Sequence, residues 1–147
     1  MTEMENVAAW QSTYLFWTFY SRQERILILP ESAKLHCNLR WNEAIALTHA
    51  AYELVDRIRP SDPTTARHLR RAAVAIPAHV AGALSAEESE SRREHVSTAR
   101  GALAEVSRQA GRAGGEQRAA ARDLQGRAVD LERAVSFQLG EVNGAFC

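Results

Sequence analysis

Lysine is almost missing from this 147-residue chain, and neither sign of charge dominates. Lys34 is the only lysine among 18 basic residues, the others being arginines, and 18 acidic residues balance them. A net charge of zero removes the broad electrostatic attraction of a protein to nucleic acid or to an acidic membrane. Any contact of that kind would depend on a local cluster of arginines.

Cysteine is scarce, and long apolar runs are absent. Cys37 and Cys147 are the only cysteines and form no CxxC or Cys–His pattern, so neither a disulfide framework nor a zinc motif is predicted. Reduced thiols and an acidic rather than basic N-terminus predict a cytoplasmic protein. The longest uncharged run, residues 6–21, has about 16 residues and falls short of the roughly 20 that a membrane span needs. No membrane partner is expected.

Motifs for catalysis and cofactor binding are lacking too. None of the five histidines follows a glutamate by three residues, and no two lie four apart. The helical di-iron and zinc-protease patterns are therefore absent. The glycine-rich stretch 111–115 lacks the Lys-Ser/Thr end of a phosphate-binding loop and is typical of a turn. No enzyme activity, no cofactor and no metal site are predicted.

Aromatic residues are rare except near the N-terminus, where six of the ten lie between Trp10 and Tyr20. Because the composition changes near residue 38, we interpret residues 1–38 as an aromatic-rich N-terminal extension and residues 39–147 as the folded domain. Four interpretations of the extension stay open. It docks on the domain, binds a partner, is poorly ordered, or is translated from an upstream start codon.

Four apolar stripes with alternating steps of three and four residues predict four helices after residue 38. In chain order the stripes are Trp41, Ile45, Thr48, Tyr52, Val55 and Ile58; Leu69, Ala73, Ile76, Val80, Ala83 and Leu84; Val96, Ala99, Leu103, Val106 and Ala110; and Leu124, Ala128, Leu131, Val135, Leu139 and Val142. Short connections between such helices predict an all-α, up-down-up-down antiparallel four-helix bundle. Many interior alanines make the core thin, which favours burial against further copies of the chain.

The ends of these helices are marked by proline, glycine and capping residues. The segment Pro60-Ser61-Asp62-Pro63 ends the first helix, and Asp62 or Thr64 is expected to cap the second. Ser85 followed by Glu88 predicts a capping box that opens the third helix. The glycines of residues 111–115 separate it from the fourth, which is expected to begin near residue 116.

The segment Arg70–Gly82 carries the most unusual pattern. Pro77 lies inside a helical stripe, where it removes one backbone hydrogen bond and leaves the carbonyl of Ala73 free, so either a kink or a break is expected. Arg70 and Arg71 cannot both face the core. They are either solvated or ion-paired surface residues, or contacts to phosphate or to a neighbouring subunit.

This segment, Arg-Arg-Ala-Ala-Val-Ala-Ile-Pro-Ala-x-Val-Ala, resembles the signature of the four helix bundle protein family encoded in intervening sequences of bacterial 23S ribosomal RNA genes. The accessory variability determinants of diversity-generating retroelements are similar. Residues 41–44 (Trp-Asn-Glu-Ala) resemble the opening of that family's first helix. Residues 99–106, which include Glu105, resemble its third. The resemblance covers residues 39 to about 140.

The resemblance implies a homopentameric ring without enzymatic activity. Our first hypothesis is therefore a structural or adaptor module, a homo-oligomer whose outer or axial surface binds a protein partner. The retroelement relatives imply the alternative, an accessory protein that binds nucleic acid or a reverse transcriptase. His79 and Gly82 replace the Asn and Glu of the family pattern. The absence of net positive charge weighs against the alternative. The candidate interface or nucleic-acid contacts are Arg70, Arg71, Pro77, His79, Arg92, Arg93 and Glu105.

Overall fold

The computed structural model describes residues 31–140, with side chains placed from residue 39 to residue 136. This part of the chain contains no strand and forms four α-helices with one short 3-10 turn. They are α2 (Glu31–Ile58), α3 (Pro63–Ser85), α4 (Ser89–Ala110), the turn η1 (Gly115–Gln117) and α5 (Arg118–Gly140). The all-α prediction is confirmed.

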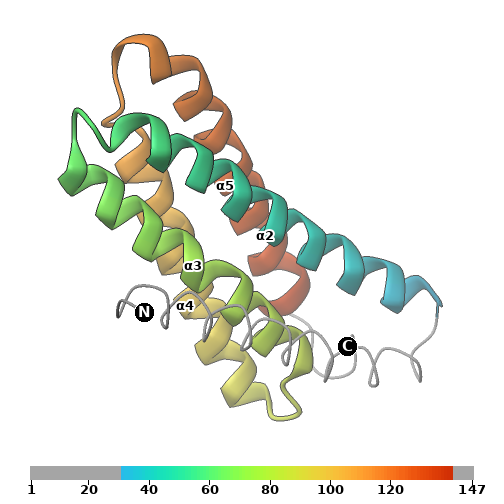
Figure 1. The fold of residues 1–147 in the computed structure, drawn as a ribbon. Coiled ribbons are helices and arrows are strands. Elements are labelled where there is room, and N and C mark those ends of the chain that lie inside the picture. The colour runs from blue at the N-terminus through green and yellow to red at the C-terminus, as the bar shows by residue number, and fades with distance from the viewer. Residues whose placement is uncertain (1–30, 141–147) are drawn as a thin grey trace, which may run out of the picture.

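The four helices pack as a bundle in which each helix lies beside the next one in the chain (Figure 1). Helix α5 closes the bundle by returning to α2, and this pair packs less extensively than the other three neighbouring pairs. Short connections make consecutive helices antiparallel. The up-down-up-down arrangement is therefore as predicted. Helix α2 runs without interruption through residue 38, where the composition changes.

The end of α2 and the start of α3 follow the proline and capping signals. The carboxylate of Asp62 accepts a hydrogen bond from the backbone amide of Thr65 at 3.0 Å, and Pro63 occupies the first position of α3. An N-cap carboxylate satisfies one of the amides that a helix start leaves without a partner. Asp62, one of the two expected caps, is therefore the cap.

The capping box predicted at Ser85 and Glu88 is wrong. Ser85 is the last residue of α3, and its hydroxyl donates to the carbonyl of Ala81 at 2.9 Å within the same helix. Glu88 itself holds the cap position of α4, without a side-chain hydrogen bond. A serine at the end of a helix can bond back to the preceding turn, and here that local bond replaces the capping bond.

The stripes predicted for α3 and α4 form the core, and so does the part of the α5 stripe that the structure describes. Their buried members are Leu69, Ala73, Ile76, Val80, Ala83, Leu84, Val96, Ala99, Leu103, Val106, Ala110, Leu124, Ala128, Leu131 and Val135. Leu139 and Val142 lie outside the described side chains. Alanines at so many of these positions let the helices approach closely.

The stripe predicted for α2 is wrong in its middle. Ile45 is 39% exposed, and Thr48 and Tyr52 are only half-buried. The buried face instead combines the expected ends of the stripe with small and branched residues between them: Trp41, Ala44, Leu47, Ala51, Leu54, Val55 and Ile58. Apolar residues surround most of α2, so spacing alone allows more than one stripe, and close packing selects the one that contains Leu47 and Leu54.

Pro77 lies inside α3, which continues from Pro63 to Ser85 without a break. Of the two expectations for this proline, a break between two shorter helices is therefore excluded. The pyrrolidine ring is fully buried. The hydroxyl of Thr48 on α2 lies 3.2 Å from the carbonyl oxygen of Ala73, the one that Pro77 leaves without an amide. A side chain from the neighbouring helix thus supplies the missing donor.

Candidate functional site

A groove runs between α2 and α5, which form the least extensive contact among the neighbouring helices of the bundle. Its floor contains the branched side chains of Leu47, Leu54 and Leu131, and its walls contain the small residues Ala46 and Ala50. One part of the groove has a volume of about 320 Å³. A second part shares Ala46 with the first and extends toward the end of α5 that holds Ala120. Small residues on both walls leave this seam open because they do not fill the space between the helices.

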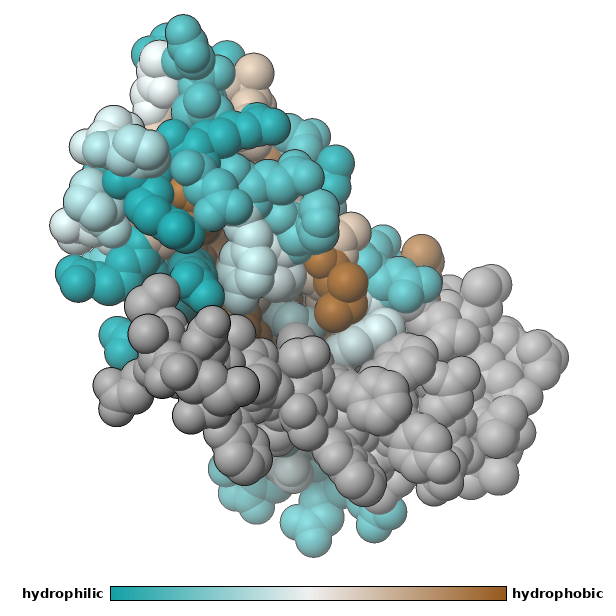
Figure 2. Space-filling view, in the orientation of Figure 1, coloured by the Kyte–Doolittle hydropathy of each residue, from teal (hydrophilic) through white to brown (hydrophobic). Residues whose placement is uncertain are grey.

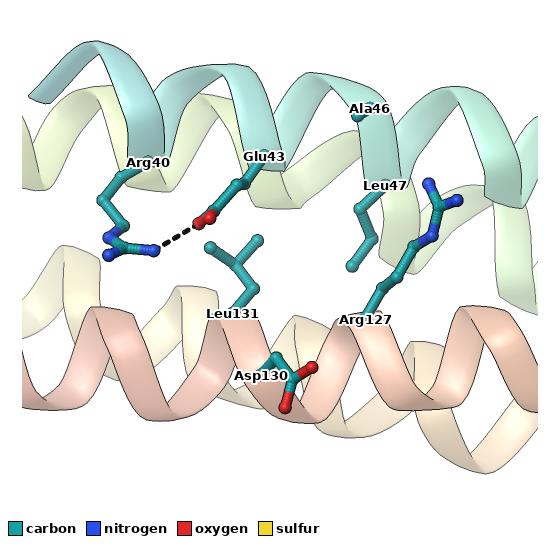
Figure 3. A pocket seen from close by; sticks show the side chains of 7 residues that line it. All are labelled: Arg40, Glu43, Ala46, Leu47, Arg127, Asp130 and Leu131. Carbon is teal, nitrogen blue, oxygen red and sulfur yellow. Dashed lines mark hydrogen bonds and ion pairs between the residues drawn. The ribbon is translucent and has the colours of Figure 1, made fainter. Parts of the chain in front are cut away.

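The rim of the groove is charged but carries both signs. Figure 3 shows Leu47 and Leu131 reaching into the space between the two helices, with Arg40 and Glu43 joined across one turn of α2. The Arg40 guanidinium donates to the Glu43 carboxylate at 2.5 Å. The complete set of charged residues on the rim is Arg40, Glu43, Glu53, Arg57, Asp123, Arg127 and Asp130. Three arginines therefore face four carboxylates.

Large apolar side chains are rarely exposed elsewhere on the described surface. The exceptions are Leu39, Ile45 and Val129, with exposures of 44%, 39% and 39%. Figure 2 shows hydrophilic residues over most of the described surface in that view, with a few hydrophobic side chains between them. Two of the three exposed apolar residues belong to α2, the helix that forms one wall of the groove.

Arg70 and Arg71, on α3, both point outward and are exposed. The Arg70 guanidinium carbon lies 5.8 Å from the centre of the Tyr52 ring on α2. This distance is within the range of a cation–π contact, which ties the arginine to the α2–α3 interface. Arg70 is therefore a surface arginine engaged with its own bundle.

Arg92 and Arg93 lie in the first turns of α4. The Arg92 guanidinium donates to the carbonyl of Ala86 at 2.9 Å and so braces the α3–α4 connection, while Arg93 is exposed. This contact holds the Arg92 guanidinium at Ala86, directly after the last residue of α3. Fourteen helical residues separate that end of α3, Ser85, from Arg71, which is roughly 21 Å along the bundle. The two arginine pairs predicted from the sequence thus form two separate positions.

Glu105 belongs to a local cluster on α4. Its carboxylate pairs with the guanidinium of Arg108 and accepts a hydrogen bond from the amide of the buried Gln109 at 2.6 Å. All three residues are on one helix at spacings of three and four. Glu105 therefore stabilises its own helix and contacts none of the predicted arginines.

His79, which the family pattern singles out, meets a histidine that the sequence did not single out as a contact. The Nδ1 atom of His79 on α3 lies 3.1 Å from the Nδ1 atom of His95 on α4. The two rings are tilted by 43° with centroids 5.4 Å apart. Burial lowers the pKa of the His79 imidazole, and the neighbouring His95 acts in the same direction.

Gly82 makes the approach of these rings possible. A Cβ atom built at Gly82 would lie 2.6 Å from both Nδ1 and Cε1 of the His95 ring. The ring of His95 thus packs against the bare backbone of α3, one turn after His79. His79 and Gly82, which replace the Asn and Glu of the pattern that the segment Arg70–Gly82 resembles, meet His95 at one place.

Spacing rules along one helix cannot detect this pair, because its members are 16 residues apart on different helices. In two antiparallel helices, residues at equal distances from the centre of their connection lie side by side. His79 and His95 are each eight residues from residue 87, the centre of the connection 86–88, so this rule would have predicted their contact. The α2–α5 groove has no such signal, because it depends on how loosely two helices pack.

The part of the chain from residue 31 to residue 140 holds no group of three or more His, Cys, Asp or Glu side chains suited to a metal ion. In the same range, no helix combines the length and the apolar character that crossing a membrane requires. Cys37 and Cys147 lie outside the described side chains. No protein-family model, curated protein or solved structure matches this chain.

Proposed function

We propose that this protein is a non-enzymatic structural or adaptor module that assembles from copies of itself, and that the copies meet at the α2–α5 groove. The observation that carries the proposal is the combination of an apolar floor with a rim of both charge signs. A second copy of the chain, whose net charge is zero, suits such a rim. The resemblance of the segment Arg70–Gly82 to a pentamer-forming family supports five as the number of copies.

The thin core supports the same proposal. Alanine contributes little apolar area when it is buried, so a bundle whose interior is rich in alanine gains less stability than one filled with leucine. Leu39 and Ile45 on α2, which are 44% and 39% exposed, offer further apolar area on the helix that forms one wall of the groove. Burying this area between copies adds stability that a single copy lacks.

The rim also separates this proposal from the alternative of an accessory protein for nucleic acid or reverse transcriptase. Phosphate backbones are bound by clustered arginine or lysine. The groove instead places four carboxylates beside three arginines. The candidate arginines outside the groove lie at two positions roughly 21 Å apart along the bundle. Both features favour a protein partner, in the first place another copy.

The experiment is light scattering coupled to size exclusion on the full chain at micromolar concentration. Ala46 lines both parts of the groove and is exposed. Ala46→Arg should reduce the mass of the wild-type assembly, because a long charged side chain blocks the apolar floor. Ala104→Arg, at an exposed position on α4, is the matched control and should leave the mass unchanged.

Circular dichroism of both variants confirms that they keep the helical fold. A wild-type protein that is monomeric under these conditions contradicts the assembly. An assembly that withstands Ala46→Arg but dissociates with Ala104→Arg contradicts the groove as its interface. Binding of structured RNA or duplex DNA that weakens steeply between two salt concentrations would support the alternative.

A further inference from the structure

The imidazoles of His79 on α3 and His95 on α4 approach each other through their ring nitrogens. His79 and His95 direct the same kind of atom, Nδ1, toward each other at 3.1 Å. A ring nitrogen either donates through a hydrogen or presents a lone pair. In the metal-free protein one ring must therefore carry the Nδ1 hydrogen and the other must accept it.

The same spacing is the one that two ligands of a single metal ion adopt. Imidazole nitrogens bind zinc at about 2.0–2.1 Å, and two such bonds spanning 3.1 Å enclose an angle of roughly 95–100° at the metal. This angle lies between the square and the tetrahedral arrangements that late first-row metals accept. The terminal torsion of histidine is broad, so modest ring rotations can turn both lone pairs toward one ion.

We propose that His79 and His95 form a two-histidine site for a divalent transition-metal ion, of the zinc, nickel and copper class. Imidazole ligands suit these ions, whereas magnesium and calcium require oxygen ligands. No third ligand accompanies the pair among the described side chains, so water completes the coordination. The site is therefore open and exchangeable, and bound metal would join α3 to α4 beside their connection.

Gly82 acts as a positioning residue for this site. The absence of its side chain lets the His95 ring lie against α3, with Nδ1 on the side that faces His79. Any larger residue at position 82 would have to displace the ring, because a Cβ atom would come within 2.6 Å of it. Replacement of Gly82 should therefore weaken metal binding although it removes no ligand.

The test is a titration of the full chain with Zn²⁺, followed by NMR of the protein labelled with ¹⁵N at histidine. We expect the Nδ1 signals of His79 and His95 to shift together and to saturate at one ion per chain. His79→Ala and His95→Ala should each weaken Zn²⁺ binding by at least about tenfold, since even outer-shell partners of metal ligands contribute that much. Calorimetry with Ni²⁺ should rank the metal affinities of the wild type and the variants in the same order as Zn²⁺ does.

His68→Ala is the matched control, because His68 is an exposed histidine on the same helix as His79. It should bind Zn²⁺ as the wild type does. Gly82→Ala, which keeps both ligands, should weaken binding without abolishing the helical circular dichroism. Zn²⁺ that shifts neither ring, or that binds His79→Ala and His95→Ala with wild-type affinity, overturns the proposal. The site does not depend on the proposed assembly, because both ligands come from one copy.

Discussion

The hydroxyl of Thr48 lies 3.2 Å from the carbonyl oxygen of Ala73, across the interface between α2 and α3. Ala73 is fully buried, and the proline four residues later cannot offer its carbonyl an amide hydrogen. The same hydroxyl lies 2.9 Å from the carbonyl of Ala44, so it is shared between two helices. The single hydrogen of this hydroxyl is thus shared between the Ala44 carbonyl and the Ala73 carbonyl that Pro77 leaves without an amide.

Replacing this hydroxyl should destabilise the bundle measurably. Thr48→Val keeps the shape of the side chain but leaves the Ala73 carbonyl buried without a donor, which should lower the free energy of unfolding by about 1–2 kcal/mol. Urea unfolding followed by circular dichroism measures the change. Thr48→Ser, which retains the hydroxyl, should lose less.

Pro77→Ala provides the second half of this test, because it restores an amide hydrogen to the Ala73 carbonyl. Thr48→Val should then cost less in the Pro77→Ala background than in the wild type, with a coupling of about 0.5–1 kcal/mol. Additive losses in the double variant would mean that the hydroxyl does not replace the missing amide.

Two glycines in the bundle should respond to alanine with opposite signs. At Gly82 an added methyl group meets the His95 ring at 2.6 Å, and displacing that ring should reduce stability by about 1–3 kcal/mol. At Gly101, in the middle of α4, nothing lies within 4 Å of the added atom. Gly101→Ala should therefore raise stability by about 0.5–1 kcal/mol through helix propensity. Thermal unfolding of both variants in EDTA, which removes any metal contribution, compares them directly.

The cap of α3 should make stability depend on acid pH. Hydrogen bonds from Thr65 lower the pKa of Asp62 from 3.8 in the folded protein. The folded state therefore favours the carboxylate, and its stabilising contribution is present above the unfolded pKa and is lost as the pH falls through the folded value. Urea midpoints measured between pH 7 and the acid range, in matched ionic strength, follow this loss.

Asp62→Asn separates the charge from the cap. Asparagine also caps helices but does not titrate, so this variant should keep most of the stability at neutral pH and lose the acid dependence that belongs to Asp62. Asp62→Ala should be less stable than Asp62→Asn at neutral pH. Equal stability of the two would show that the side-chain bond to Thr65 contributes nothing.

The face that α2 buries can be tested with two apolar residues. Leu54 is only 2% exposed, and Leu54→Ala should lower the free energy of unfolding by about 2–5 kcal/mol. Ile45 is 39% exposed, and Ile45→Ala should cost less than about 1 kcal/mol. If Ile45→Ala lowered the free energy of unfolding more than Leu54→Ala, the buried face of α2 would be the one that spacing alone predicts.

These residues also show how far the sequence determines the structure. In α3, α4 and the described part of α5 the members of the predicted stripes are buried, so periodicity identified the core of these helices correctly. In α2 apolar residues occur on most sides, and only the distance between packed helices distinguishes Leu54 from Ile45. The cap at Asp62 is local and was predictable. The hydrogen bond from the Ser85 hydroxyl to the Ala81 carbonyl is local as well. The same hydroxyl could instead cap α4, and the sequence does not decide between these two bonds.

The candidate sites were less accessible to such reasoning, because both depend on contacts between helices. Arg70 and His79 were singled out by a sequence pattern that says nothing about their neighbours. Their partners, Tyr52 and His95, follow from the register between helices, which is set by packing of the whole bundle. The α2–α5 groove follows from packing that is loose at one seam, a property that no single residue encodes.

The unequal helix contacts of the bundle also bear on the order in which it forms. The three extensive contacts join helices that are adjacent in the chain, whereas α2 and α5 are separated by the whole domain. Bringing α2 and α5 together costs the most chain entropy, because they are the farthest apart in sequence, and it forms the smallest interface between neighbouring helices. We therefore expect this seam to close last during folding and to open first in native-state hydrogen exchange. A partner bound at the groove would then hold α2 and α5 together and stabilise the part of the bundle that forms last.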